Sequence, residues 1–236
     1  MKFVAVDVSN VHYEQYPFPH TIIDNFLKTE TLPDILTNVN NLTDAEASSK
    51  FITRGPYEYN KYAFSNNYSS YLKELFIELN SPEFIQHLEK LTGIQHIITN
   101  DITLRGGGVH RIKNNGYLHL HTDFNSYYNA EGVKLDRRIN LLIYLNPEWE
   151  ESYNGSLWLC DKNTRTCIKK INPILNRCVI FNTTNSSIHG HPVPLNIPNN
   201  MSRQSIAVYY YTKNINGATD FEGDVEHSTT WYSKQF

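Results

Sequence analysis

The chain has 236 residues, of which 40% are hydrophobic and 13% aromatic, and its formal net charge is -3. This length predicts one domain over residues 1–236 with a sizeable core, and the composition excludes a globally disordered chain. The slightly negative charge carries no electrostatic signature of nucleic-acid binding. No apolar stretch approaches the length of a membrane span, so we expect neither nucleic acid nor membrane as a partner.

The three cysteines, Cys160, Cys167 and Cys178, are too few and too irregular for a disulfide framework. The N-terminal stretch MKFVAVDVSN lacks the apolar core of a secretory signal, because Asp7 interrupts it. We therefore expect a soluble, cytoplasmic protein with free thiols.

Residues 20–95 show a mostly helical pattern. Pro33 stands where the first turn of a helix tolerates proline. Residues 69–79 place their leucine and phenylalanine side chains on one helical face. Ser81 is an N-cap candidate for a further helix, which Gly93 ends. These helices are expected to flank a sheet rather than to form a separate domain.

After about residue 96 the pattern changes to short strands rich in β-branched and aromatic residues, separated by turn-forming glycine, asparagine and proline. Eight such strands without intervening helices predict an antiparallel sandwich or barrel, and thus a mainly β fold with flanking α-helices. The expected strands are 102–105, 117–123, 139–146, 156–160, 165–171, 177–182, 188–193 and 203–212.

A candidate metal site begins with His121 and Asp123 at the end of one expected strand. Residues i and i+2 of a strand point to the same face, so both side chains can reach one point. A later strand offers His189 or His191 as a third ligand, and alternation cannot separate these two. Two histidines and one carboxylate on one face are typical of non-haem Fe(II) oxygenases. The competing interpretation of this short motif is an ordinary histidine that forms a hydrogen bond near a turn.

Two further strands carry polar residues on one face of an otherwise apolar run. Arg203 and Ser205 share a face near the C-terminus, and an arginine there can bind a carboxylate bidentately. Asn140 and Tyr144 share a face of the strand 139–146. Polar groups at alternate positions indicate a lined cavity, although a core tyrosine is an equal alternative for Tyr144.

Taken together, these motifs resemble the 2-oxoglutarate/Fe(II)-dependent oxygenases, in their prolyl-4-hydroxylase-like branch. The resemblance covers about residues 17–212, and the glycine tract 105–110 is similar to bacterial and phage members. The motifs that carry it are the entry segment 17–27 (PFPHTIIDNFL), His121-x-Asp123, the strand 137–146 (RRINLLIYLN), Ser187-Ile188-His189 and Arg203-x-Ser205.

The resemblance implies a double-stranded β-helix, or jelly roll, over about residues 100–212, buttressed by N-terminal helices. It implies Fe(II) held by the catalytic residues His121, Asp123 and His189. It places Arg203 on the C5 carboxylate of 2-oxoglutarate, helped by Tyr144. Cofactor-binding positions are also implied for Asn140 and Ser205. O₂ is the second co-substrate, and the expected reaction is hydroxylation of an unactivated C–H bond.

Alternatives remain for the substrate and for the class of protein. The branch suggests a prolyl residue, whereas a free amino acid, a glycan or a natural-product intermediate would use the same metal site. The partner is therefore a small-molecule, peptide or protein substrate. Segments 48–68 and 124–136, rich in asparagine, tyrosine and serine, are the expected walls of its entrance. A jelly-roll binding protein without turnover and a zinc hydrolase with the same three ligands are the competing classes.

Overall fold

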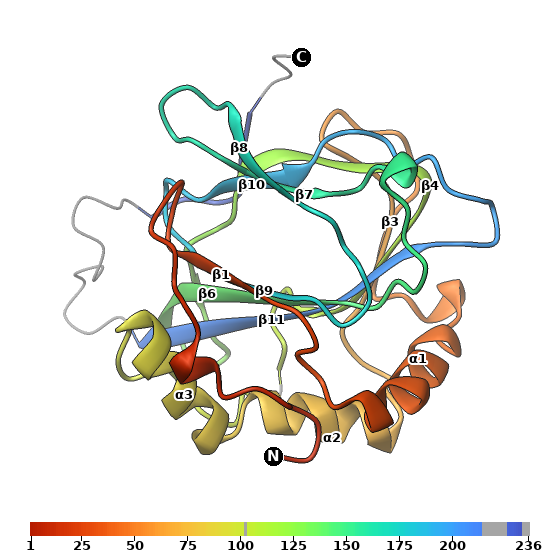
Figure 1. Cartoon of the computed structure of the whole chain (residues 1–236). Coiled ribbons are helices and arrows are strands. Elements are labelled where there is room, and N and C mark those ends of the chain that lie inside the picture. The colour runs from red at the N-terminus through yellow and green to blue at the C-terminus, as the bar shows by residue number, and fades with distance from the viewer. Residues whose placement is uncertain (102, 214–225, 233–236) are drawn as a thin grey trace.

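A computed structural model describes residues 1–101, 103–213 and 226–232 (Figure 1). Within these ranges the dominant element is one curled, twelve-stranded sheet in which every strand pair is antiparallel. The strands are β1 (His20–Ile23), β2 (Ser49–Phe51), β3 (Glu58–Phe64), β4 (Gly108–Thr122), β5 (Ser126–Tyr128), β6 (Lys134–Tyr144), β7 (Leu157–Cys160), β8 (Cys167–Ile171), β9 (Cys178–Asn182), β10 (Ile188–His191), β11 (Arg203–Lys213) and β12 (Thr230–Trp231).

Three α-helices precede the long strands: α1 (Leu32–Asn40), α2 (Ser70–Leu79) and α3 (Pro82–Thr92). Their ends follow the expected local signals. The Ser81 hydroxyl accepts a hydrogen bond from the amide of Phe84, with Pro82 in the first turn. Gly93 closes the same helix with a φ of 75°, a left-handed conformation that glycine adopts without steric cost. All three helices cover the outer face of the lower sheet layer in Figure 1.

The sheet folds back on itself in the order β1-β9-β6-β11-β4-β10-β7-β8. The long strand β4 is shared by the two layers and connects them. Its first residues, from Gly108 to Ile112, pair with β11, and its last residues pair with β10. This arrangement confirms the expected mainly β fold, a double-stranded β-helix. It also places the end of β4 beside β10, in the upper layer of Figure 1.

Alternation along β6 divides the structure into a core and a cavity. Ile139, Leu141 and Ile143 are fully buried in the cluster that contains the helical side chains. Asn140 and Leu142 point the other way and line an internal cavity. A strand with a period of two can serve both purposes because successive side chains lie on opposite faces.

Three expectations are corrected by the structure. Residues 20–95 are not mostly helical, because β1, β2 and β3 lie among the helices. Residues 103–105 form no strand, while residue 102 lies outside the described residues. The strand expected at 117–123 is longer, since β4 begins at Gly108 and ends at Thr122. None of the three described helices is both long and apolar enough to cross a bilayer.

Candidate active site

The three predicted metal ligands come together where β4 and β10 pair. His121 lies on the penultimate residue of β4 and is the direct partner of His189 on β10. Asp123 follows immediately after β4, so it reaches the same face as His121. One nitrogen or oxygen atom from each of the three side chains lies within 4.8 Å of the others. The sequence spacing therefore predicted this cluster correctly as a geometric feature.

The donor atoms have separations that suit a single metal ion. His121 Nε2 lies 3.5 Å from Asp123 Oδ1, and His189 Nε2 lies 3.3 Å from Asp123 Oδ2. Metal–ligand bonds of about 2.1 Å at right angles would place donor atoms about 3 Å apart. All three side chains are largely buried, and they leave one side open to the cavity. The set fits Fe(II) with its remaining coordination positions free.

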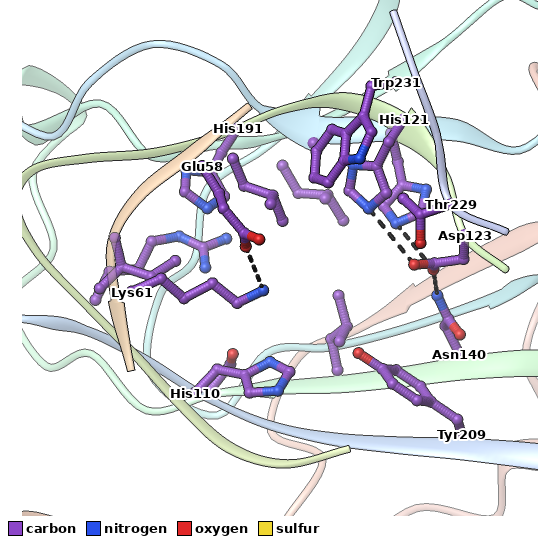
Figure 2. Close-up of a pocket in the computed structure, with 18 residues that line it drawn as sticks. Glu58, Lys61, His110, His121, Asp123, Asn140, His191, Tyr209, Thr229 and Trp231 are labelled. Atoms are coloured by element: carbon purple, nitrogen blue, oxygen red, sulfur yellow. Dashed lines mark hydrogen bonds and ion pairs between the residues drawn. The ribbon is translucent and has the colours of Figure 1, made fainter. Parts of the chain in front are cut away.

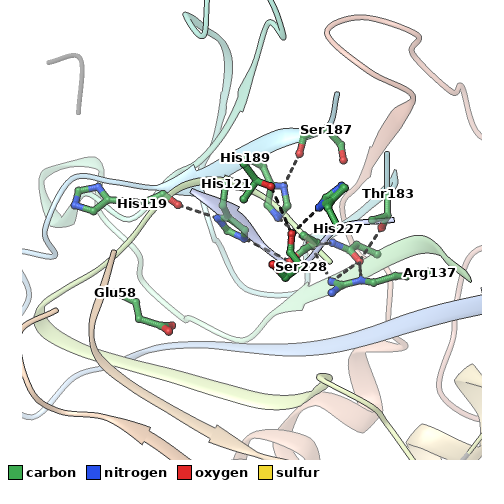
Figure 3. A network of polar contacts seen from close by, with 12 residues as sticks. Glu58, His119, His121, Arg137, Thr183, Ser187, His189, His227 and Ser228 are labelled. Atoms are coloured by element: carbon green, nitrogen blue, oxygen red, sulfur yellow. Dashed lines mark hydrogen bonds and ion pairs between the residues drawn. The ribbon is translucent and has the colours of Figure 1, made fainter. Parts of the chain in front are cut away.

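Both imidazoles are held in one orientation by the backbone. His121 Nδ1 lies 2.8 Å from the carbonyl oxygen of His119, and His189 Nδ1 lies 2.8 Å from that of Ser187 (Figure 3). Each Nδ1–H donates to its carbonyl, which leaves Nε2 unprotonated and free to bind a metal. Burial lowers the pKa of His121, and the neighbouring His189 lowers it further. The His121 side chain is therefore kept in the neutral form that a metal requires.

The Asp123 carboxylate is fixed from behind by two side chains of β6. Arg137 Nη2 donates to Asp123 Oδ2 over 2.8 Å, and Asn140 Nδ2 donates to the same oxygen over 2.7 Å. Arg137 also donates to Asn140 Oδ1 from Nε and Nη2, over 3.0 and 2.8 Å. Burial alone would raise the pKa of Asp123, but Arg137 and the two imidazoles hold it well below its usual range.

Sequence reasoning missed Arg137 and gave Asn140 a different role. In a regular strand, residues 137 and 140 would face opposite ways. The pairing of β6 with β11 shifts register at this point, since Tyr210 pairs with Ile139 but Tyr211 pairs with Arg137. The irregularity turns Arg137 toward Asn140. The one signal in the sequence was a charged residue entering an apolar strand.

Arg203 lines a cavity that the three donor residues also line, and it is itself buried. Its Nε donates to the carbonyl oxygen of Gly155 over 2.8 Å, and its Nη2 lies 3.4 Å from the Tyr144 hydroxyl. Burial raises the pKa of Tyr144, so its hydroxyl stays protonated. Because a guanidinium has five N–H donors, Arg203 keeps donors for a carboxylate in the cavity.

This cavity has a volume of about 190 Å³. Asn140 and Ser205 line it, as the strand alternation predicted, and so does His191. Segment 48–68 contributes Glu58 and Lys61 to its wall (Figure 2). No described residue of 124–136 lines it, so that part of the expected entrance is wrong. The C-terminal residues Thr229 and Trp231 line it instead, and no sequence motif pointed to them.

Part of the chain matches a known protein family. Residues 107–211, which run from the start of β4 through most of β11, match the sequence model described as the 2OG-Fe(II) oxygenase superfamily. The match covers a little less than half of the chain, and this strand-rich part resembles the 2OG-Fe(II) oxygenase superfamily. Fe(II), 2-oxoglutarate and O₂ are the cofactor and co-substrates that this family implies. No curated protein sequence matches this chain significantly.

Solved structures with the same fold include three informative ones. A prolyl-4-hydroxylase from Pseudomonas putida is 12% identical, with a TM-score of 0.58 over 88% of the oxygenase and 100% of its own chain. A prolyl hydroxylase from Trichoplax adhaerens, in complex with a hypoxia inducible factor peptide, is 20% identical, with a TM-score of 0.59 over 81% and 83%. HygX from Streptomyces hygroscopicus, with nickel, 2-oxoglutarate and hygromycin B bound, is 11% identical, with a TM-score of 0.53 over 89% and 93%.

Proposed function

We propose that the oxygenase hydroxylates an unactivated C–H bond, with His121, Asp123 and His189 as the ligands of Fe(II). The observation that supports this most strongly is that one cavity is bordered by both the donor cluster and a buried arginine. His121, Asp123, His189 and Arg203 all line it, and Arg203 contacts the Tyr144 hydroxyl. A dicarboxylate in this cavity can bind the metal and place its distal carboxylate on the guanidinium.

The protein's own contribution is positioning and shielding. Bound Fe(II), 2-oxoglutarate and O₂ supply the oxidising chemistry. The backbone carbonyl oxygens of His119 and Ser187 orient the two imidazoles, and Arg137 with Asn140 orients the carboxylate. The Trp231 ring centroid lies 4.9 Å from that of His121, and because Trp231 also lines the cavity, its indole leaves less room for water beside the ligands. Restricting water access protects a reactive site from side reactions.

A test is to measure succinate release from 2-oxoglutarate together with metal content. His121→Ala, Asp123→Ala and His189→Ala should each lose bound Fe(II) and 2-oxoglutarate turnover. Their circular dichroism spectra should match that of the folded wild type. His12→Ala, at an exposed position, is the matched control and should behave like wild type. His191→Ala should keep the metal. Turnover that survives in both His121→Ala and Asp123→Ala would overturn the proposal.

Arg203 also separates this function from the two competing classes. A zinc hydrolase with the same ligands has no need of a buried arginine–tyrosine pair facing the metal, and a binding protein without turnover would release no succinate. Chelation followed by selective rescue with Fe(II), and not with Zn²⁺, is the outcome expected here. The substrate suggested by the prolyl hydroxylases of like fold is a prolyl group, either within a peptide or as a free amino acid.

A further inference from the structure

The wall of the cavity opposite the metal ligands contains a pair of charges that a regular strand would not place there. Glu58 and Lys61 both belong to β3, three residues apart, and would normally point to opposite faces. Between them the pairing with β4 shifts register, and Asn60 takes a left-handed φ of 52°. This irregularity turns both side chains into the cavity (Figure 2). Bulges that redirect side chains are common next to active sites.

The two charges are paired with each other inside the cavity. Lys61 Nζ lies 3.1 Å from Glu58 Oε2, and the side chains are 17% and 19% exposed. Each is the other's single ion-pair partner in the described part of the chain. A molecule that fills the cavity must therefore cover this pair. Covering two charges with a neutral group removes their hydration without supplying a compensating electrostatic interaction.

A third polar side chain in the same cavity has unmet hydrogen-bonding capacity. His191 is 3% exposed, and neither ring nitrogen has a hydrogen-bond partner among the described residues. Buried polar atoms without partners are rare and call for a partner from outside the chain. His191 lines the cavity and is drawn on the Glu58 side of it in Figure 2. The wall thus offers a cation, an anion and an imidazole together.

A stacked aromatic pair, of which Trp231 lines the cavity, limits the room beside these groups. The rings of Tyr57 and Trp231 stack with centroids 5.0 Å apart and planes 10° apart. β12 holds Trp231 in place, because Trp231 pairs directly with His121 on β4. A cavity of about 190 Å³ is smaller than the roughly 300–1,000 Å³ that drug-sized ligands occupy. Under the proposed function 2-oxoglutarate shares this cavity, so the part of the substrate that enters must be small.

We propose that Glu58, Lys61 and His191 form the substrate subsite, and that the substrate is a small zwitterion, a free α-amino acid. This inference rests on the proposed function. The α-carboxylate would bind Lys61 and the α-ammonium would bind Glu58, while His191 adds a hydrogen bond. The two charges of an amino acid are one carbon apart, which suits partners 3.1 Å apart. An internal peptide residue carries neither charge.

Binding is tested first, by calorimetry with the proteinogenic free L-amino acids, including L-proline, on the Ni(II)-loaded protein with 2-oxoglutarate. At least one free amino acid should bind, and its N-acetyl amide should bind at least tenfold more weakly. Glu58→Gln and Lys61→Met should each weaken binding of that amino acid by about ten- to a hundredfold, the loss expected for a charge-assisted hydrogen bond. Equal binding of free and blocked forms would overturn the subsite.

Two further variants separate recognition from a structural role. Glu14→Gln removes one charge of the Glu14–Lys169 pair, whose atoms are 2.6 Å apart outside the cavity, and should leave binding unchanged. The double exchange Glu58→Lys with Lys61→Glu keeps an ion pair but reverses it. Binding that the exchange restores to the wild-type level would mean that the pair only supports the fold, and the proposal would fail.

Succinate release with the same compounds then tests the proposed function separately. Amino-acid binding that depends on Glu58 and Lys61, without succinate from any compound, would leave the subsite standing and overturn hydroxylation. Succinate release stimulated equally by free and blocked amino acids, with no effect of the charge variants, would keep the oxygenase and overturn the subsite.

Discussion

Asp123 is the ligand candidate whose position depends most on its neighbours, because it lies just beyond the end of β4. Strand pairing fixes both imidazoles through their backbones, whereas the carboxylate is fixed by side chains. Arg137, 1% exposed, also packs its guanidinium 3.5 Å from the centre of the Tyr209 ring. The orientation of Asp123 therefore depends on Arg137, which is not itself a candidate metal ligand.

Replacing Arg137 should weaken metal binding without removing a ligand. Arg137→Met leaves the carboxylate with Asn140 alone, and loss of a partner that orients a ligand typically costs ten- to a hundredfold in metal affinity. The measurement is a Co(II) titration followed by absorbance. Arg138→Met is the matched control, because Arg138 donates to Thr212 instead. A Co(II) affinity equal to wild type in Arg137→Met would mean that the arginine only fills space.

Arg203 should govern the affinity for 2-oxoglutarate and leave the metal alone. Arg203→Ala removes a charge-assisted contact of about 1.5–3 kcal/mol, so the apparent constant for 2-oxoglutarate should rise about ten- to a hundredfold. Tyr144→Phe removes one neutral hydroxyl and should shift the constant less, in the same direction. Succinate release against 2-oxoglutarate concentration at saturating Fe(II) measures both. An Arg203→Ala titration like that of wild type would remove the co-substrate assignment.

Residue types and spacing could predict the cluster of His121, Asp123 and His189, because strand alternation and the pairing of two strand ends suffice. They could not decide between His189 and His191, which share a face in a regular strand. The structure separates them, since the pairing of β10 with β4 shifts register between the two. His189 meets Asp123, and His191 points into the cavity wall.

At the level of elements, the register shift on β10 depends on a close approach of two backbones. A Cβ added to Gly190 would lie 2.6 Å from the carbonyl oxygen of His119. The same carbonyl oxygen receives the Nδ1–H of His121. Glycine is therefore required here by space, and the approach couples β10 directly to the orientation of a ligand on β4.

Gly190→Ala should disturb both stability and metal binding. Overpacking against backbone typically costs about 1–3 kcal/mol, and each kcal/mol lowers Tm by roughly 2–4 °C in a protein of this size. Calorimetric melting and the Co(II) titration measure the two effects. Gly132→Ala is the control: its Cβ would meet nothing within 4 Å, so the metal affinity should not change. A wild-type Co(II) affinity in Gly190→Ala would contradict the coupling.

Other elements show why local pattern fails near the cavity. The helix with Ser81 and Gly93 at its ends was predictable because both signals are local. β3 was not, since its residues are half-buried along most of its length and show no alternation. A strand that has the cavity on one side and other chain segments on the other keeps polar residues on both faces. The sequence therefore predicted no strand in segment 48–68, although it did predict that the segment forms a wall of the substrate entrance.

The fold of the whole molecule was predictable from the strand pattern, but the cavity's mouth was not. The mouth combines β3 with residues 229–231, which lie more than 160 residues further along the chain and join through pairing with β4. No periodicity within either segment reports the other. The metal cluster and Arg203, in contrast, lie on strands that the sequence identified.

Binding in one cavity predicts that metal and co-substrate together stabilise the whole fold. A ligand that binds only the folded state at a hundredfold excess over its Kd contributes about 2.7 kcal/mol, which is roughly 5–11 °C in Tm for a protein of this size. Mn²⁺ with 2-oxoglutarate should therefore raise Tm by that amount over a chelator. His121→Ala should lose most of the rise. Arg203→Ala should keep the part that Mn²⁺ gives alone, because Arg203 is not one of the three candidate ligands. An equal rise in His121→Ala and wild type would place the metal elsewhere on the protein.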